Sequence, residues 1–323
     1  MSDWLLVDGA RRLLADTCTH EVVQAAESDG WSAVAWEAIA GAGYGSLAEL
    51  PVSDALAVLA VAGEYAAPVP LADGLLAGWL LGEPVAAPVA VAPANDLRLL
   101  DGRLSGRALR VPWGHAVEHV LAVVDGTAVL VGVASAAGVE RQVNLAGEPR
   151  DSLLFEEAEP EVVHPAACDL LERGALTRVA LISGALTGMA RLTVAYAAER
   201  RQFGRPIAAF QAVQRHLVDI TQDASLVAAA ADGAARLPGL FEIAAAKVLA
   251  SSAAVSATRA AHQVHGAMGM TQEYRLHHFT RRLWAWRHEY GDERHWASQL
   301  GGAVAAAGAQ RLYPAVTSGS ELV

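Results

Sequence analysis

Polar side chains able to hold an anion gather at a corner near the middle of the chain. The corner reads Glu199-Arg-Arg-Gln-Phe-Gly204, and Phe210-Gln211 follows shortly after it. The guanidinium of Arg200 offers paired hydrogen-bond donors, and the side chains of Gln202 and Gln211 add uncharged donors. The alternative role for Arg200 is that of a solvated cation in the last turn of a helix, where the helix dipole favours positive charge.

Two helices must meet at this corner to position these groups. Apolar residues before it recur with the spacing of a helix that buries one face, at Leu181, Ala185, Gly188, Leu192 and Ala195. Gly204 is expected to end this helix, and Pro206 suits the first turn of the next. Apolar residues of that second helix share one side, at Phe210, Val213, Leu217 and Ile220. The segment is therefore predicted to be a helix, a sharp corner and a second helix.

The composition of the chain limits the functions that this corner can have. The chain has 323 residues, more than one hydrophobic core usually supports, so two or three domains are expected. Hydrophobic residues make up 53% and charged residues 18%, which argues against disorder. The formal charge of −11 argues against a nucleic-acid partner, because phosphate binding needs clustered Lys and Arg.

The sequence also indicates a cytoplasmic protein with no membrane partner. Cys18 and Cys168 are the only cysteines, which fits a reducing compartment and excludes a cysteine-based zinc site. Asp3 and Asp8 stand where a signal peptide would carry positive charge and an apolar run. The apolar runs at 55–63 and 74–82 are shorter than the roughly 20 residues that span a bilayer, so they are predicted to be core helices.

The order of patterns along the chain predicts an α+β protein of three domains. Residues 1–83 read as a helical domain, and 84–160 as a small antiparallel β domain whose clearest hairpin turns at Asp125-Gly126. This β domain is expected to end in an acidic linker, Glu156 to Pro165, with no strand after it. Residues 161–323 are predicted to form a bundle of four long antiparallel helices.

Several motifs together resemble the acyl-CoA dehydrogenase family. They are, with the corner motif Glu199 to Gly204, the run Gln263-Val-His-Gly-Ala-Met-Gly269, then Glu273-Tyr274 and Arg281-Arg282, and in the N-terminal part Ala67-Pro-Val-Pro70. The order of helices, β domain and helices is also similar to that family's. The resemblance implies a three-domain fold, bound flavin adenine dinucleotide (FAD) and the α,β-desaturation of an acyl-CoA thioester, with a flavoprotein as electron acceptor.

The resemblance also implies which residues hold FAD. Arg200 matches the family arginine on the cofactor diphosphate, and Phe203 offers a flat apolar wall that is expected to be core in any case. Uncharged donors suited to ribose and adenine stand at Gln202, Gln211 and Gln263. Gly266 lets a backbone come close to the ligand, whereas Ala267 departs from the family's second glycine.

The catalytic base expected from the resemblance is missing. Most of the family carries a Glu followed by Gly 27 residues after this glutamine, and counting 27 from Gln263 leads to Tyr290, with Gly291 after it. Some relatives place the Glu 26 residues before the diphosphate arginine, which leads from Arg200 to Gly174. Glu289 is the best remaining candidate base, since burial there would raise its pKa toward neutrality.

The segment that holds the flavin ring in the family, Leu-Thr-Glu followed by Gly-Ser-Asp, is missing as well. The nearest stretch, Ala92 to Asp96, lacks its hydroxyl donors. Each flavin in this family lies across a subunit interface, so the chain resembles the subunit without the base of a two-subunit bacterial enzyme, a kind that often acts on steroid side chains. The expected assembly is a heterotetramer with a second dehydrogenase-like subunit, or a homo-oligomer.

Two alternatives stay open at this point. One is a self-sufficient dehydrogenase that uses Glu289, and the other is a non-enzymatic oligomeric binding module of the same fold. The histidines His262, His265, His277 and His278 lack the spacing of a metalloprotease site, so no metal is expected. No Gly-x-Ser-x-Gly motif supports a hydrolase.

Overall fold

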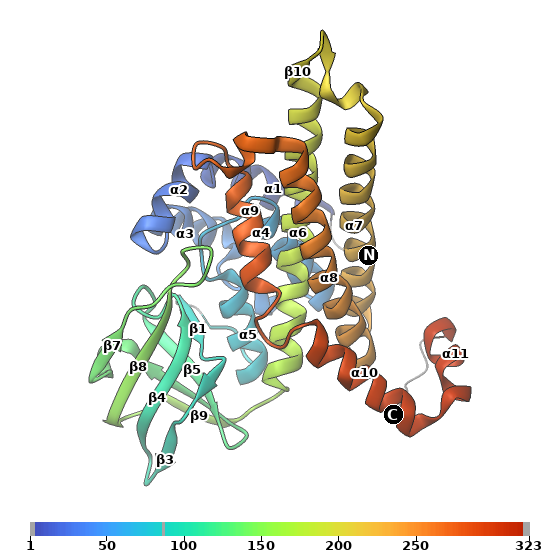
Figure 1. Ribbon diagram of the computed structural model, residues 1–323. Coiled ribbons are helices and arrows are strands. Elements are labelled where there is room, and N and C mark those ends of the chain that lie inside the picture. Colours follow the sequence, from blue (N-terminus) through green and yellow to red (C-terminus); the bar gives the residue numbers. More distant parts are fainter. Residues whose placement is uncertain (1–3, 86–87, 319–323) are drawn as a thin grey trace.

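The computed structural model describes residues 4–85 and 88–318, and it combines N-terminal helices, two β-sheets and a C-terminal helical bundle (Figure 1). The predicted α+β fold class is therefore confirmed. Asp3, and Ala86 and Ala87 at the predicted start of the β domain, lie outside the described residues.

The N-terminal part contains five α-helices. Two of them, α4 and α5, are the apolar runs predicted to be core helices, and most of their residues are buried. A side-chain cap fixes the start of the second helix, because the Thr19 hydroxyl accepts a hydrogen bond from the backbone N–H of Val22. The helices are α1 (Trp4–Thr17), α2 (His20–Asp29), α3 (Ala33–Ile39), α4 (Val52–Glu64) and α5 (Leu71–Leu81).

The middle part forms two β-sheets. The first has the order β1-β5-β6-β9 and contains the predicted hairpin, whose turn residues Asp125 and Gly126 have φ angles of 48° and 78°. The pairing of β1 with β5 is parallel, so this part is not purely antiparallel. The strands of the first sheet are β1 (Val89–Val91), β5 (His119–Val124), β6 (Thr127–Gly132) and β9 (Val162–Pro165).

The second sheet has the order β2-β4-β8-β7, and β3 also pairs with β4. Its strands are β2 (Ala94–Asn95), β3 (Arg98–Leu100), β4 (Arg103–Pro112), β7 (Gly138–Glu140) and β8 (Arg150–Ala158). The predicted linker from Glu156 to Pro165 is wrong, since β8 runs to Ala158 and β9 ends at Pro165. β9 pairs with β6 and forms an edge of the first sheet. The acidic residues next to β9 therefore lie at the surface.

The bundle has three long helices, and the fourth predicted helix is divided. A break separates α9 from α10, where Tyr290 and Gly291 have φ angles of 53° and 86° that no helix accommodates. The helices are α6 (Leu170–Glu199), α7 (Gln211–Arg236), α8 (Leu240–His265), α9 (Leu276–Trp286), α10 (Glu293–Ala307) and α11 (Ala309–Ser318).

A β-hairpin forms the corner between α6 and α7 and stands away from the body of the molecule (Figure 1). Its strands are β10 (Arg201–Gln202) and β11 (Arg205–Pro206), and its turn residues Phe203 and Gly204 have φ angles of 50° and 80°. The predicted helix start at Pro206 is wrong. A short 3-10 turn, Ile207–Ala209, intervenes, and α7 begins at Gln211.

The N-terminal helices and the bundle share one buried core, whereas most of the β part has its own. Helices α4 and α6 approach so closely that a Cβ added at Gly184 would lie 1.7 Å from the Ala60 carbonyl oxygen. The boundaries at 83 and 160 therefore divide the fold by secondary structure, and the three-domain division stays a proposal.

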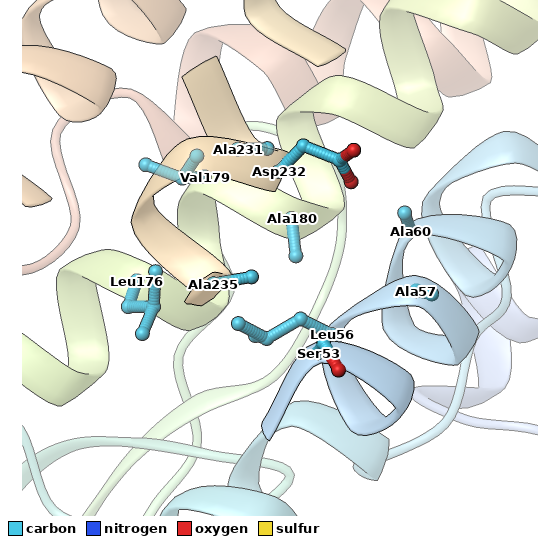
Figure 2. A pocket seen from close by; sticks show the side chains of 10 residues that line it. All are labelled: Ser53, Leu56, Ala57, Ala60, Leu176, Val179, Ala180, Ala231, Asp232 and Ala235. Carbon is cyan, nitrogen blue, oxygen red and sulfur yellow. The ribbon is translucent and has the colours of Figure 1, made fainter. Parts of the chain in front are cut away.

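A cavity of about 40 Å³ lies where α4, α6 and α7 meet (Figure 2). Short side chains such as Ala57, Ala180 and Ala235 leave this space, with Asp232 at its edge. It has room for only a few water molecules, so we interpret it as a packing void between helices.

Two bundle helices, α6 and the segment Leu240–Met270 that contains α8, are long and apolar enough to cross a membrane by length and composition alone. Their apolar windows are 72% and 50% buried inside the protein. Both helices pack against other bundle helices, which accounts for their apolar composition.

Candidate functional site

Six of the seven predicted cofactor residues line one pocket beside the hairpin. This corner pocket has a volume of about 430 Å³, within the range of ligand sites. The six are Arg200, Gln202, Phe203, Gln263, Gly266 and Ala267. Gln211, the first residue of α7, does not line it, although its neighbours Phe210 and Val213 do.

The polar groups of the corner pocket face an open end of the bundle. Arg200 is exposed and makes no side-chain hydrogen bond or ion pair with any described residue. Gly266 has a φ of 58°, and a Cβ added there would meet nothing within 4 Å. The buried Nε2 of His265 has no partner among the described residues, and the His265 ring stacks on Tyr196 at 4.4 Å. The pocket therefore combines an unpaired donor group, the Arg200 guanidinium, with an unpaired acceptor, His265 Nε2, because Nδ1 of that ring donates to the Ala261 carbonyl.

Phe203 is not a core residue, contrary to the sequence-based expectation. Its side chain is 90% exposed, because the left-handed turn holds it at the tip of the hairpin. A left-handed conformation is costly for a bulky residue and is found most often at functional sites. The ring of Phe210 lies edge-on to it at 6.0 Å. The exposed Phe203 ring would enclose a ligand only if a second surface covered the ligand's other side.

The two positions where the resembled family carries its base meet in space. Gly174 lies on α6 and Tyr290 lies in the break after α9, and a Cβ added at Gly174 would be 2.2 Å from Tyr290 Cδ1. Neither residue is a carboxylate. Tyr290 is 7% exposed, its hydroxyl has no partner among the described residues, and burial raises the pKa of this phenol. It therefore stays protonated near neutral pH and is a poor base.

Glu289, the candidate base, is held between two buried arginines. Arg178 Nε donates to its Oε2 at 2.5 Å, and Arg150 Nη2 donates to its Oε1 at 2.6 Å. Burial acts to raise the pKa of Glu289, but the charges of both guanidiniums outweigh it and bring the pKa to about 2. The expectation of a pKa near neutrality is wrong for this reason. At such a pKa the carboxylate is a weak proton acceptor.

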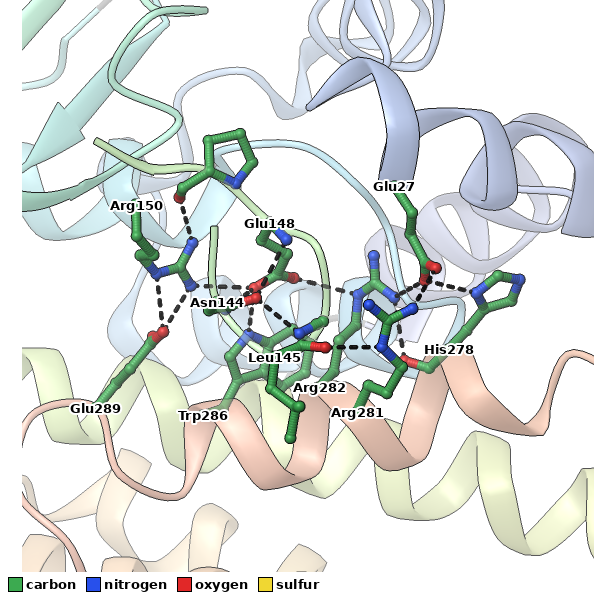
Figure 3. A network of polar contacts seen from close by, with 12 residues as sticks. Glu27, Asn144, Leu145, Glu148, Arg150, His278, Arg281, Arg282, Trp286 and Glu289 are labelled. Carbon is green, nitrogen blue, oxygen red and sulfur yellow. Dashed lines mark hydrogen bonds and ion pairs between the residues drawn. The ribbon is translucent and has the colours of Figure 1, made fainter. Parts of the chain in front are cut away.

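Glu289 belongs to a polar network that the sequence did not reveal (Figure 3). Arg150 Nη2 also donates to Glu148, which in turn accepts a hydrogen bond from Trp286 Nε1, both at 3.0 Å. Arg282 lies 3.2 Å from Glu148 and 3.2 Å from Glu27 of α2. The network therefore joins the N-terminal helices, the loop before β8 and the bundle, and we interpret it as structural.

Protonating this network should unfold the protein in acid. The pKa of Glu27, like that of Glu289, falls to about 2, because His278, Arg282 and Arg281 outweigh the effect of burial. Carboxylates with a depressed folded pKa stabilise the fold above their unfolded pKa of 4.5. Each is expected to lose about 3 kcal/mol of stabilisation as the pH falls toward 2. Urea unfolding at a series of pH values checks this, and a flat profile from about pH 5 to pH 2 would contradict it.

The region expected to face a flavin ring offers no free donors. Asn95, the only amide of the Ala92 to Asp96 stretch, donates from Nδ2 to the Val123 carbonyl and accepts from the Leu97 N–H through Oδ1. Asp96 pairs with Arg107. Asn95 links the two sheets and Asp96 pairs within the second sheet, so neither side chain offers a free donor to a ring.

Histidines do gather around one carboxylate, but arginines already hold it. The ligand atoms of Glu27, His277 and His278 lie within 4.8 Å of one another. Arg281 and Arg282 donate to both oxygens of Glu27 at 2.9 and 3.2 Å, and a dication would have to displace these positive charges. We interpret this cluster as part of the structural network.

Comparisons with known proteins agree with the fold and the corner motifs. Residues 165–293 match the family model described as the acyl-CoA dehydrogenase C-terminal domain. The acyl-CoA dehydrogenase FadE28 of Mycobacterium tuberculosis is 28% identical over 221 residues, 64% of each chain. Two solved structures, the Tcur3481-Tcur3483 steroid acyl-CoA dehydrogenase and the ChsE4-ChsE5 complex of M. tuberculosis, align over 93% of this chain with TM-scores of 0.83 and 0.81.

The segment 165–293 is therefore similar to the C-terminal domain of acyl-CoA dehydrogenases. The two solved structures cover 97% and 96% of their own chains at 23% and 21% identity, so they show that the fold is shared. Matches to curated relatives span from 26% to 64% of those relatives' lengths.

Proposed function

We propose that this chain is the subunit without the base in a heteromeric, FAD-dependent acyl-CoA dehydrogenase. In this proposal its corner pocket holds the adenosine diphosphate part of FAD, and a second dehydrogenase-like subunit supplies the ring site and the base. The steroid-type neighbours make CoA thioesters of steroid side chains the favoured substrate class. A separate electron-transfer flavoprotein would accept the electrons.

The single observation that carries the proposal is the contact of Gly174 with Tyr290. Both places where a family member carries its base coincide here, and no free carboxylate stands at either. The corner pocket, by contrast, keeps its arginine, its glutamines and the open Gly266. A chain with half of a cofactor site and no base suits a partner subunit better than a self-sufficient enzyme.

The residues present fit one half of a dinucleotide. In the proposal, Arg200 pairs with the diphosphate, and Gln202 and Gln263 donate to the ribose and the adenine. Phe203 packs against the adenine ring. When bound, FAD would accept the hydride from the β-carbon of the acyl group. The exposed hairpin would cross the interface, which accounts for a bulky side chain that is 90% exposed in one chain.

Removing the guanidinium of Arg200 tests the cofactor assignment. The flavin content of the purified complex should fall about tenfold to a hundredfold in Arg200→Ala, because a charge-assisted, paired contact is lost. Arg200→Lys should restore only part of it, since an ammonium lacks the two-pronged geometry. Arg201→Ala is the matched control, an exposed neighbour that does not line the pocket, and it should keep its flavin. Equal flavin content in the two alanine variants would contradict the assignment.

Co-purification distinguishes the alternatives. The proposal expects a second dehydrogenase-like chain with a Glu at the base position to accompany this one. A single chain that is yellow and desaturates acyl-CoA would support the self-sufficient enzyme with Glu289. A colourless oligomer with no partner would support the non-enzymatic binding module.

A further inference from the structure

A lysine on α8 is completely buried inside the bundle. Lys247 has an exposed fraction of 0%, and it is the only lysine among the 24 Lys and Arg residues of the chain. A charged lysine is almost never fully buried without a partner of opposite charge. No carboxylate among the described residues forms an ion pair with Lys247. Groups other than an acidic side chain therefore hold this amine.

The partners of the amine lie at the end of α9. Lys247 Nζ donates to the carbonyl oxygens of Trp286 and Arg287 at 3.2 and 2.9 Å. The Ser251 hydroxyl, one turn further along α8, donates to the same Arg287 carbonyl at 3.2 Å and lies 3.5 Å from Nζ. Carbonyls in the last turn of a helix have no partner within that helix. Lys247 and Ser251 therefore fasten the end of α9 to α8.

The backbone is weakly held where α9 ends. The N–H groups of Arg287, His288 and Glu289 make backbone hydrogen bonds of 3.2 Å, at the long end of the normal range. The left-handed conformations of Tyr290 and Gly291 follow directly. Strained turns persist only where the surrounding structure fixes them, and weakly bonded segments are the first to open. The donors from α8 therefore help to keep the break after α9 closed.

Burial makes the latching amine easy to deprotonate. It has the largest effect on Lys247 and lowers its pKa from 10.5 to about 7. Of the charged groups around the amine, Glu289 in the break opposes this decrease, whereas Arg178 of α6 adds to it. Glu293 and Asp292, at the start of α10, oppose it more weakly. Above pH 7 the amine is neutral and keeps two N–H bonds, one for each carbonyl. A guanidinium cannot lose its proton in this way, which accounts for a lysine at this position.

We propose that Lys247 is a pH-sensitive latch: the neutral amine holds the end of α9 against α8, and uptake of a proton by this amine favours opening of the break. Opening would separate Glu289 from Arg150 and Arg178, so the latch controls one end of the polar network. The device requires neither FAD nor a second subunit, and it stands or falls separately from the proposed function.

The direction of the pH dependence follows from the two forms of the amine. In the opened form Lys247 reaches water and regains its ordinary pKa of 10.5, whereas in the closed form the pKa is about 7. The opened form therefore binds the additional proton between these two values. Closing becomes more favourable as the pH rises from 7 to 10.5, and it does not depend on this proton below pH 7.

Hydrogen exchange of the backbone amides of Arg287, His288 and Glu289 measures the opening, in the full chain or in the complex where a partner co-purifies. After correction for base catalysis of the exchange itself, the protection of these amides should increase about tenfold between pH 8 and pH 9. Unchanged protection over this interval would overturn the latch.

Two variants assign the pH dependence to one residue. Lys247→Met removes the titrating amine, so the protection of the same amides should no longer change between pH 8 and pH 9. Arg259→Met is the matched control, because Arg259 is an exposed cation on the same helix, and this variant should keep the tenfold increase. A tenfold increase that persists in folded Lys247→Met would overturn the assignment.

The wild-type chain provides a test that does not depend on the folding of Lys247→Met. Because the chain has a single lysine, ¹³C-labelled lysine in this chain alone gives one side-chain signal in an NMR spectrum. The Cε shift should titrate with a midpoint near 7 in the folded protein. A midpoint near the ordinary 10.5 would overturn the proposal, since the amine would then be charged in both forms.

Discussion

Replacing Glu289 with glutamine should lower the free energy of unfolding by about 3–5 kcal/mol, because the buried Arg178 loses its paired carboxylate and Arg150 keeps only Glu148. The side chains of Arg150 and Arg178 are only 10% and 3% exposed, and both donate to this one carboxylate. Urea unfolding followed by circular dichroism measures the change.

An exposed ion pair provides the control for Glu289→Gln. Arg103 and Glu159 lie 3.2 Å apart with side chains 52% and 77% exposed, so Glu159→Gln should change stability by less than about 1 kcal/mol. Similar effects of the two substitutions would refute the structural role of Glu289. The result also bears on kinetics, since lost activity in Glu289→Gln reports on catalysis only if the variant remains folded.

A single methyl group between α4 and α6 should be nearly as damaging. Gly184→Ala places its Cβ 1.7 Å from the Ala60 carbonyl oxygen, and the two helices must separate to accept it. We expect a loss of about 3 kcal/mol from this overpacking.

The same substitution elsewhere in the bundle serves as the control. Gly233 lies within α7, and a Cβ added there meets nothing within 4 Å. Gly233→Ala should therefore stabilise the protein by about 0.5–1 kcal/mol through helix propensity. Thermal unfolding of the two variants compares them directly, and equal melting temperatures would disprove the close contact of α4 with α6.

The sequence predicted the features of the fold and site that depend on local residue patterns. Periodic apolar residues identified the face of α6 that packs inward, where Leu181, Ala185 and Leu192 are buried, although Ala195 is exposed. Short motifs identified the corner pocket, because α6, α7 and the end of α8 are each read from nearby residues. Counting along the chain led separately to Gly174 and Tyr290, and the fold brings them into contact.

The polar network could not be predicted, because its members are far apart in the sequence. Arg178 and Glu289 are separated by 111 residues, and Arg150 and Glu289 by 139. Each of these residues looks like an ordinary surface charge when read alone. Only tertiary packing decides whether burial raises the pKa of Glu289 or two guanidiniums lower it. The hairpin was missed for a related reason, since Phe203 takes a left-handed conformation that sequence pattern disfavours.

In the proposed complex, this chain does not supply the proton-abstracting base. Anaerobic exchange of the α-proton of an acyl-CoA for deuterium measures that step alone, with the complex carrying Tyr290→Phe compared with the wild-type complex. The proposal predicts exchange rates within about tenfold of each other, a barrier change under about 1.4 kcal/mol. A loss of about a hundredfold or more in the folded, flavin-loaded variant would contradict it, since that is the effect usual for a lost general base.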